Sequence, residues 1–123
     1  MRKVLLILAA VIITTAVNAG VPRAEYPRPQ FERASWLNLN GEWTYELDLV
    51  KTGHEKGFPG SNGFDGKIIV PFAPESELSG VGHKDFIPSI WYQREITIPQ
   101  DWEGKDILLN FGAVYYVSEI YID

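Results

Sequence analysis

The chain has 123 residues, a formal net charge of −5 at pH 7 and no cysteine. This length is enough for one domain with its own core but too short for a second, catalytic domain. The acidic balance and the lack of a lysine or arginine cluster argue against nucleic acid as a partner, and the lack of cysteine excludes a disulfide framework.

The first 19 residues have the three zones of a secretory signal peptide. Two basic residues, Arg2 and Lys3, precede an apolar run at 4–13 and a small-residue stretch that ends at Ala19. We predict cleavage after Ala19 and a periplasmic or secreted protein, with no stable membrane insertion afterwards. The alternative, a single membrane anchor, is disfavoured because the apolar run is shorter than the roughly 18 to 20 residues that span a bilayer.

Residues 20–32 contain three prolines and no apolar period, which predicts an extended leader that serves as a linker or as a strap across a neighbouring domain. The domain proper is expected at 33–123. Strand-like alternation begins at 36–39, a tight turn is expected at Asn40–Gly41, and apolar residues alternate with polar ones over 42–48.

Two loops and one short strand are expected in the middle of the chain. Residues 51–66 are rich in glycine and polar residues, whereas 67–70 form a strongly apolar strand that Pro71 ends. The stretch 72–89 is long and has no period. Loops of this length in a compact domain are usually functional, which suggests a binding or docking loop.

Three strands are expected at 90–98, 106–111 and 114–122, with apolar and polar residues alternating clearly in the first and last. No segment beyond the signal peptide has a helical period, so we predict an all-β fold, an antiparallel β-sandwich or jelly roll. Because the last strand would lack a partner, we expect the jelly roll to be incomplete at the C-terminus, and the isolated chain to be poorly stable or to aggregate.

Four sequence blocks, in this order, carry a family resemblance. They are RASWLNLNGEW at 33–43, IVPFAPES at 69–76, WYQR at 91–94 and FGAV at 111–114. Together they resemble the N-terminal sugar-binding domain of family 2 glycoside hydrolases, which include β-galactosidases, β-glucuronidases and β-mannosidases. The resemblance covers roughly residues 28–123.

The resemblance implies a galactose-binding-domain-like jelly roll that is followed, in such enzymes, by an immunoglobulin-like domain and a TIM barrel. The barrel holds the two catalytic glutamates, and it is absent from this chain. The implied ligands are β-linked glycosides, and no redox cofactor is implied. One departure is Tyr115, where relatives often carry Asp or Asn.

Paired carboxylates at 75 and 77 and at 101 and 103 are the candidates for glycoside hydrolysis, which needs two carboxyl groups about 5 Å apart. Both pairs lie in turn-like segments where carboxylates are ordinarily solvated, so we expect no catalytic residue in this chain. The two histidines, His54 and His83, are too few and too far apart for a metal site. Residues 60–63 lack the spacing of a nucleophile elbow, and 80–82 are too short to cradle phosphate.

Eight residues are candidates for contacts with carbohydrate or with a neighbouring domain: Glu75, His83, Lys84, Asp85, Trp91, Tyr92, Arg94 and Trp102. For Trp91 and Trp102 we favour core or interdomain packing, and stacking on the C–H face of a sugar ring is the alternative. For Arg94 a structural salt bridge is the default, and a contact to the downstream barrel is the alternative. Core positions are expected at Trp36, Trp43, Phe72 and Phe111.

The function expected from these features is that of the non-catalytic N-terminal domain of a secreted β-glycosidase, which supports a catalytic barrel elsewhere in the protein. Two alternatives belong to other classes. One is a free-standing carbohydrate-binding module without catalytic activity, and the other is an inert scaffold or adhesion domain whose aromatic residues all lie in the core.

Overall fold

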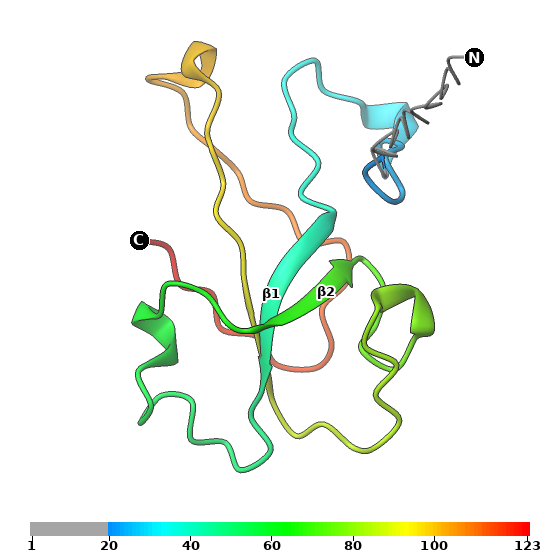
Figure 1. The fold of residues 1–123 in the computed structure, drawn as a ribbon. Helices are drawn as coiled ribbons and strands as arrows, with labels where there is room; N and C mark the ends of the chain where they lie inside the picture. Colours follow the sequence, from blue (N-terminus) through cyan, green and yellow to red (C-terminus); the bar gives the residue numbers. More distant parts are fainter. Residues whose placement is uncertain (1–19) are drawn as a thin grey trace, which may run out of the picture.

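The computed structural model describes residues 20–123, and the expected signal peptide lies outside them. A three-stranded antiparallel sheet forms the centre of the fold. Figure 1 labels its strands β1 and β2. Strand β1 (Gly41–Leu47) lies in the middle, flanked by β2 (Gly66–Val70) and β3 (Ile90–Gln93). The fold is therefore all-β, as the sequence predicts.

Residues 20–123 contain no α-helix, and none of their helical turns is long and apolar enough to cross a membrane. Single 3₁₀ turns punctuate the loops instead. They are η1 (Pro29–Phe31), η2 (Phe58–Gly60), η3 (Glu77–Ser79) and η4 (Gln100–Trp102). Within these residues, the lack of α-helix agrees with the lack of a helical period in the sequence beyond the signal peptide.

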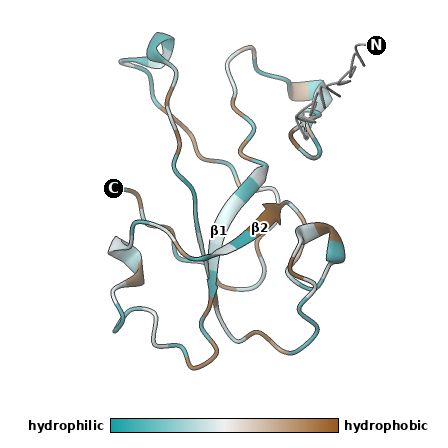
Figure 2. Cartoon of the chain, viewed as in Figure 1, coloured by the Kyte–Doolittle hydropathy of each residue, from teal (hydrophilic) through white to brown (hydrophobic). Residues whose placement is uncertain are grey.

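The pairing of β1 with β2 buries the apolar centre of the molecule. Gly41 lies opposite Val70 and Tyr45 lies opposite Gly66, so Ile68 faces Trp43 across the ladder. The side chain of Ile68 is fully buried, and the apolar end of β2 is visible as the brown arrowhead in Figure 2. The predicted contrast between inward apolar and outward acidic residues on this strand is only partly present, because Glu42 is exposed whereas Glu46 is half-buried and Asp48 is buried.

Strand β3 is shorter than the predicted 90–98. Its ladder with β1 runs only from Leu47 opposite Ile90 to Thr44 opposite Gln93. Beyond Gln93 the chain leaves β1 and rises toward η4, as Figure 1 shows in yellow. Residues 94–98 therefore have no neighbouring backbone to pair with, and a period of two alone does not make a strand.

Both expected loops are present. Residues 51–65 contain η2 and are held to β3 by Gln93, whose Nε2 donates to the carbonyl of Ser61 at 2.7 Å. The long loop at 72–89 contains η3, where Ser76 Oγ caps the turn by accepting from the Leu78 N–H at 3.2 Å.

Several predicted strands and core positions are wrong. Segments 36–39, 106–111 and 114–122 form no strand, because no backbone pairs with them in the structure, and Asn40–Gly41 leads directly into β1 instead of forming a hairpin turn. Phe111, which was expected in the core, is 47% exposed. Trp36, Trp43 and Phe72 are only half-buried, so the core is smaller than the sequence suggests.

Candidate functional site

The long loop brings four of the eight candidate residues together. Lys84 Nζ donates to the backbone carbonyl of Glu75 at 2.6 Å, and the His83 N–H donates to the Pro74 carbonyl at 2.9 Å. These two bonds close the neck of the loop. The side chains of Glu75, Lys84 and Asp85 are exposed, so the loop presents both negative and positive groups to solvent.

Tyr92 on β3 belongs to the same neighbourhood. Burial raises the pKa of Tyr92 to about 12, and the nearby carboxylate of Glu75 and phenol of Tyr45 add to the effect. A tyrosine is protonated at neutral pH even at its ordinary pKa of about 10, so the phenol of Tyr92 is available as a hydrogen-bond donor. Tyr92 is 39% exposed, so part of its side chain is accessible to a ligand.

Trp91 lies in a different environment, because successive side chains of a strand point to opposite faces. Its ring packs edge-on against Phe58 and His54, with centroids 5.7 Å and 5.1 Å away, and stacks against Tyr121 at 6.0 Å. Its indole N–H donates to Asp48 Oδ2 at 3.2 Å. The half-buried Trp91 thus packs internally, the interpretation that its sequence context favoured.

The polar centre of this cluster is Asp48, a residue that the sequence did not single out. Only 2% of Asp48 is exposed, and its two carboxylate oxygens accept from the Thr52 N–H at 2.8 Å and the Gly53 N–H at 2.7 Å. Burial by itself would raise the pKa of Asp48. The hydrogen bonds from Thr52, Gly53 and Trp91, together with the charge on Lys56, outweigh burial and hold the pKa below its usual value.

Asp48→Asn is expected to remove a pH dependence of stability. A carboxyl group whose pKa is lower in the folded state stabilises the protein above its unfolded pKa of about 3.9, and that contribution is lost as pH falls through the folded pKa. The wild-type urea midpoint should therefore fall more steeply between about pH 5 and pH 2 than that of the variant. Parallel profiles for the two proteins would contradict this role.

Arg94 does not form the expected salt bridge. Its Nη1 donates to the backbone carbonyls of Leu39 at 2.7 Å and Asn40 at 3.0 Å, and its guanidinium carbon lies 6.0 Å from the ring centroid of Trp43. None of the ion pairs found within residues 20–123 includes Arg94. The reason is geometric: Arg94 lies beyond the end of β3, where it meets the chain entering β1 and not an acidic side chain.

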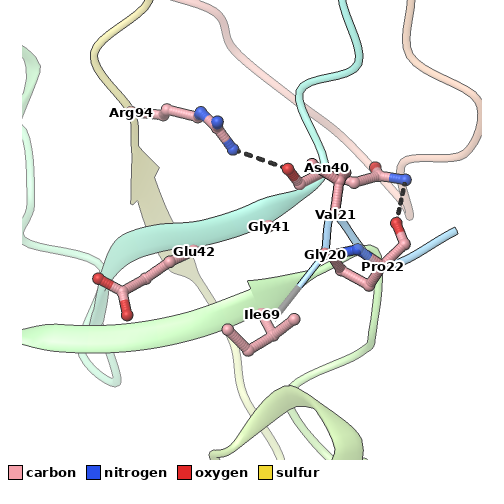
Figure 3. Close-up of a pocket in the computed structure, with 8 residues that line it drawn as sticks. All are labelled: Gly20, Val21, Pro22, Asn40, Gly41, Glu42, Ile69 and Arg94. Atoms are coloured by element: carbon pink, nitrogen blue, oxygen red, sulfur yellow. Dashed lines mark hydrogen bonds between the residues drawn. The ribbon is translucent and has the colours of Figure 1, made fainter. Parts of the chain in front are cut away.

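Beside Arg94 lies an open pocket of about 500 Å³, shown in Figure 3. The leader forms one wall, and Asn40 fixes it there by donating from Nδ2 to the Pro22 carbonyl at 3.1 Å. The strands β1 and β2 form the other wall. The lining residues are Gly20, Val21, Pro22, Asn40, Gly41, Glu42, Ile69 and Arg94. Sequence reasoning missed Asn40, which it assigned to a turn.

Trp102 is the last of the eight candidate residues. Trp102 is half-buried in η4, at the end of the excursion that extends away from the sheet in Figure 1. The carboxylates considered for catalysis, at 75, 77, 101 and 103, are all exposed. In the part of the chain that the structure describes, no three His, Asp or Glu side chains cluster in a way that would hold a metal ion.

Comparison with known proteins shows which enzymes this chain is similar to. The chain is similar to β-glucuronidases. It is 26% identical to the β-glucuronidase of Felis catus over 110 residues, and 27% identical to that of Canis lupus familiaris over 115 residues, with 80% of this chain covered in each case. A third β-glucuronidase, from Streptococcus agalactiae, is 27% identical over 59 residues, or 48% of this chain. No protein-family model matches the chain.

The chain covers 16% of the length of the two mammalian relatives and 10% of the length of the streptococcal one. The similarity therefore concerns a small part of each relative.

Proposed function

We propose that this chain is the N-terminal sugar-binding domain of a family 2 glycoside hydrolase, with the jelly-roll architecture of such domains. The observation that carries the proposal is the similarity to β-glucuronidases over 80% of the chain, combined with an all-β antiparallel sheet. The role is non-catalytic: the domain supports a catalytic barrel that belongs to the rest of the protein. The whole protein hydrolyses β-linked glycosides, with β-glucuronides as the first class to test.

The site chemistry agrees with a supporting role. Retaining glycoside hydrolysis requires two carboxyl groups about 5 Å apart in a cleft that shields the sugar from water. The pocket beside Arg94 has a single carboxylate, Glu42, among its lining residues. The exposed loop residues Glu75, Lys84 and Asp85, together with Tyr92, supply hydrogen-bonding groups that suit contact with a sugar or with a neighbouring domain.

We also propose that the protein is periplasmic or secreted, on the strength of the basic, apolar and small-residue zones of its first 19 residues. Mass spectrometry of the protein recovered from the periplasm or medium should then show an N-terminus at Gly20. An N-terminus at Met1 in the exported protein would contradict cleavage.

A glycosidase assay tests the proposed function. The purified chain is incubated with the fluorogenic β-glucuronide and β-galactoside of 4-methylumbelliferone, alongside a longer gene product that continues past Asp123 into a barrel. We expect turnover by the longer protein and none by the 123-residue chain above a buffer blank. Without two positioned carboxyl groups the uncatalysed barrier remains.

Turnover that follows the 123-residue chain through size-exclusion chromatography would contradict the non-catalytic role. A gene whose reading frame stops at Asp123 would contradict the role of supporting a barrel.

A further inference from the structure

The guanidinium of Arg94 has an unused hydrogen-bonding edge. Its Nη1 carries two hydrogens, and both are directed at backbone carbonyls, those of Leu39 and Asn40. Among the residues that the structure describes, Nε and Nη2 have no hydrogen-bond partner and Arg94 has no acidic partner. Neither nitrogen is among the buried side-chain atoms that lack a partner, so this edge is accessible to solvent or to a ligand. The free Nε–Nη2 edge is the planar fork that accommodates a carboxylate through two parallel hydrogen bonds.

The two backbone bonds also fix the orientation of this edge. They hold the guanidinium against the chain that enters β1, and Figure 3 shows the side chain directed from beyond β3 toward Asn40. The conformational entropy of a long arginine side chain is therefore largely lost before any ligand arrives. A preorganised donor of this kind binds a ligand at a smaller entropic cost than a free surface arginine.

The pocket in front of Arg94 is open and has the volume of a small-molecule site. Its volume of about 500 Å³ lies inside the range of roughly 300 to 1,000 Å³ that is usual for such sites. Val21, Pro22 and Ile69 supply apolar wall, and Glu42 is the carboxylate among the lining residues. Glu42 is engaged by Lys67, whose Nζ lies 2.7 Å from Glu42 Oε1, so its negative charge is partly compensated.

We propose that this pocket binds a sugar that bears a carboxylate, that is, a uronic acid or its glycoside. The carboxylate pairs with Nε and Nη2 of Arg94, and the apolar wall covers a C–H face of the sugar ring. The sugar component of this inference rests on the proposed function, whereas the carboxylate component rests on the unpaired guanidinium. No residue of the exposed loop at 72–89 lines this pocket, so the proposal adds a second candidate site to the domain.

A matched pair of ligands tests the role of the carboxylate. Methyl β-D-glucuronide and methyl β-D-glucoside differ only in a carboxylate that replaces a hydroxymethyl group. Each is titrated into the full chain by calorimetry, with tryptophan fluorescence as a second readout because the Trp43 ring lies 6.0 Å from the guanidinium. We expect the glucuronide to bind at least about tenfold more tightly, since a charge-assisted bidentate pair is lost with the glucoside. Acetate, as a free carboxylate, should bind more weakly than the glucuronide.

Three variants assign this preference to the pocket. Arg94→Lys keeps the charge but lacks the fork, so glucuronide affinity should fall about tenfold while glucoside affinity stays the same. Glu42→Gln removes the like charge from the pocket and should strengthen glucuronide binding about two- to fivefold, a gain that misfolding does not mimic. Lys105→Gln, which removes the charge of an exposed lysine outside the pocket, is the control for a general effect of net charge and should leave both affinities unchanged.

Equal affinity for the two methyl glycosides would overturn the inference, and so would acetate binding as tight as that of the glucuronide. Glucuronide binding that is unaltered in a folded Arg94→Lys variant would overturn it as well. None of these outcomes bears on the proposed supporting role, which the glycosidase assay of the longer protein decides separately. Conversely, a failure of that assay leaves the carboxylate preference measurable in this chain.

Discussion

Replacing Ile68 with alanine is expected to lower the free energy of unfolding by about 2 to 5 kcal/mol, the range measured for truncation of large buried aliphatic side chains. Ile68 is the fully buried hydrophobic side chain at the centre of the β1–β2 ladder, opposite Trp43. Its removal leaves a cavity that the two strands fill only in part. Urea unfolding followed by tryptophan fluorescence measures the change.

Ile122→Ala provides the matched control, because it removes the same atoms from a side chain that is 83% exposed. We expect this control to change stability by no more than about 0.5 kcal/mol. Equal effects of the two substitutions would show that Ile68 is not the core of the folded state.

Gly66→Ala is expected to destabilise the chain by about 1 to 3 kcal/mol, as overpacking in a closed site does. A Cβ at Gly66 would lie 2.6 Å from the backbone oxygen of Tyr45 and 2.7 Å from its ring. The backbone oxygen is fixed by the pairing of Tyr45 with Gly66, so relief requires the two strands to separate locally. The urea midpoint and the melting temperature should both fall.

Gly60→Ala is the control for this substitution, because a Cβ at Gly60 meets nothing within 4 Å. Its effect should remain within about 0.5 kcal/mol. If Gly66→Ala left the melting temperature unchanged, the close approach of β1 and β2 at this position would be wrong.

The C-terminal third of the chain shows that a segment with strand-like alternation does not always form a strand. Segment 114–122 has the alternation of a half-buried strand, yet Val117 is 77% exposed and Ile122 is 83% exposed in the structure. Alternation shows that a segment fits a sheet, whereas a strand also needs a neighbouring backbone to satisfy its N–H and C=O groups. In the structure this segment reaches the rest of the molecule through Tyr121 and Glu119, which contact Trp91 and His54.

The candidate site was predictable where it depended on nearby residues. The loop at 72–89 was expected because it lacks a period and contains glycine and proline, and its exposed charges at 75, 84 and 85 lie where a loop would place them. By contrast, the partners of Arg94 lie more than 50 positions earlier in the chain. The sequence led us to expect an acidic partner because acidic residues are abundant, but abundance carries no information on which of them lies nearby.

The sequence by itself determined the all-β class, the positions of β1 and β2 and the loops between the strands, because alternation and turn residues act over a few neighbouring positions. Only the tertiary structure decided that Asp48 is buried beneath Trp91, that Arg94 caps the entry to β1, and that residues 106–122 remain unpaired. Each of these outcomes depends on a partner that is distant in sequence, and local patterns do not encode which distant backbone or charge will be adjacent in the folded chain.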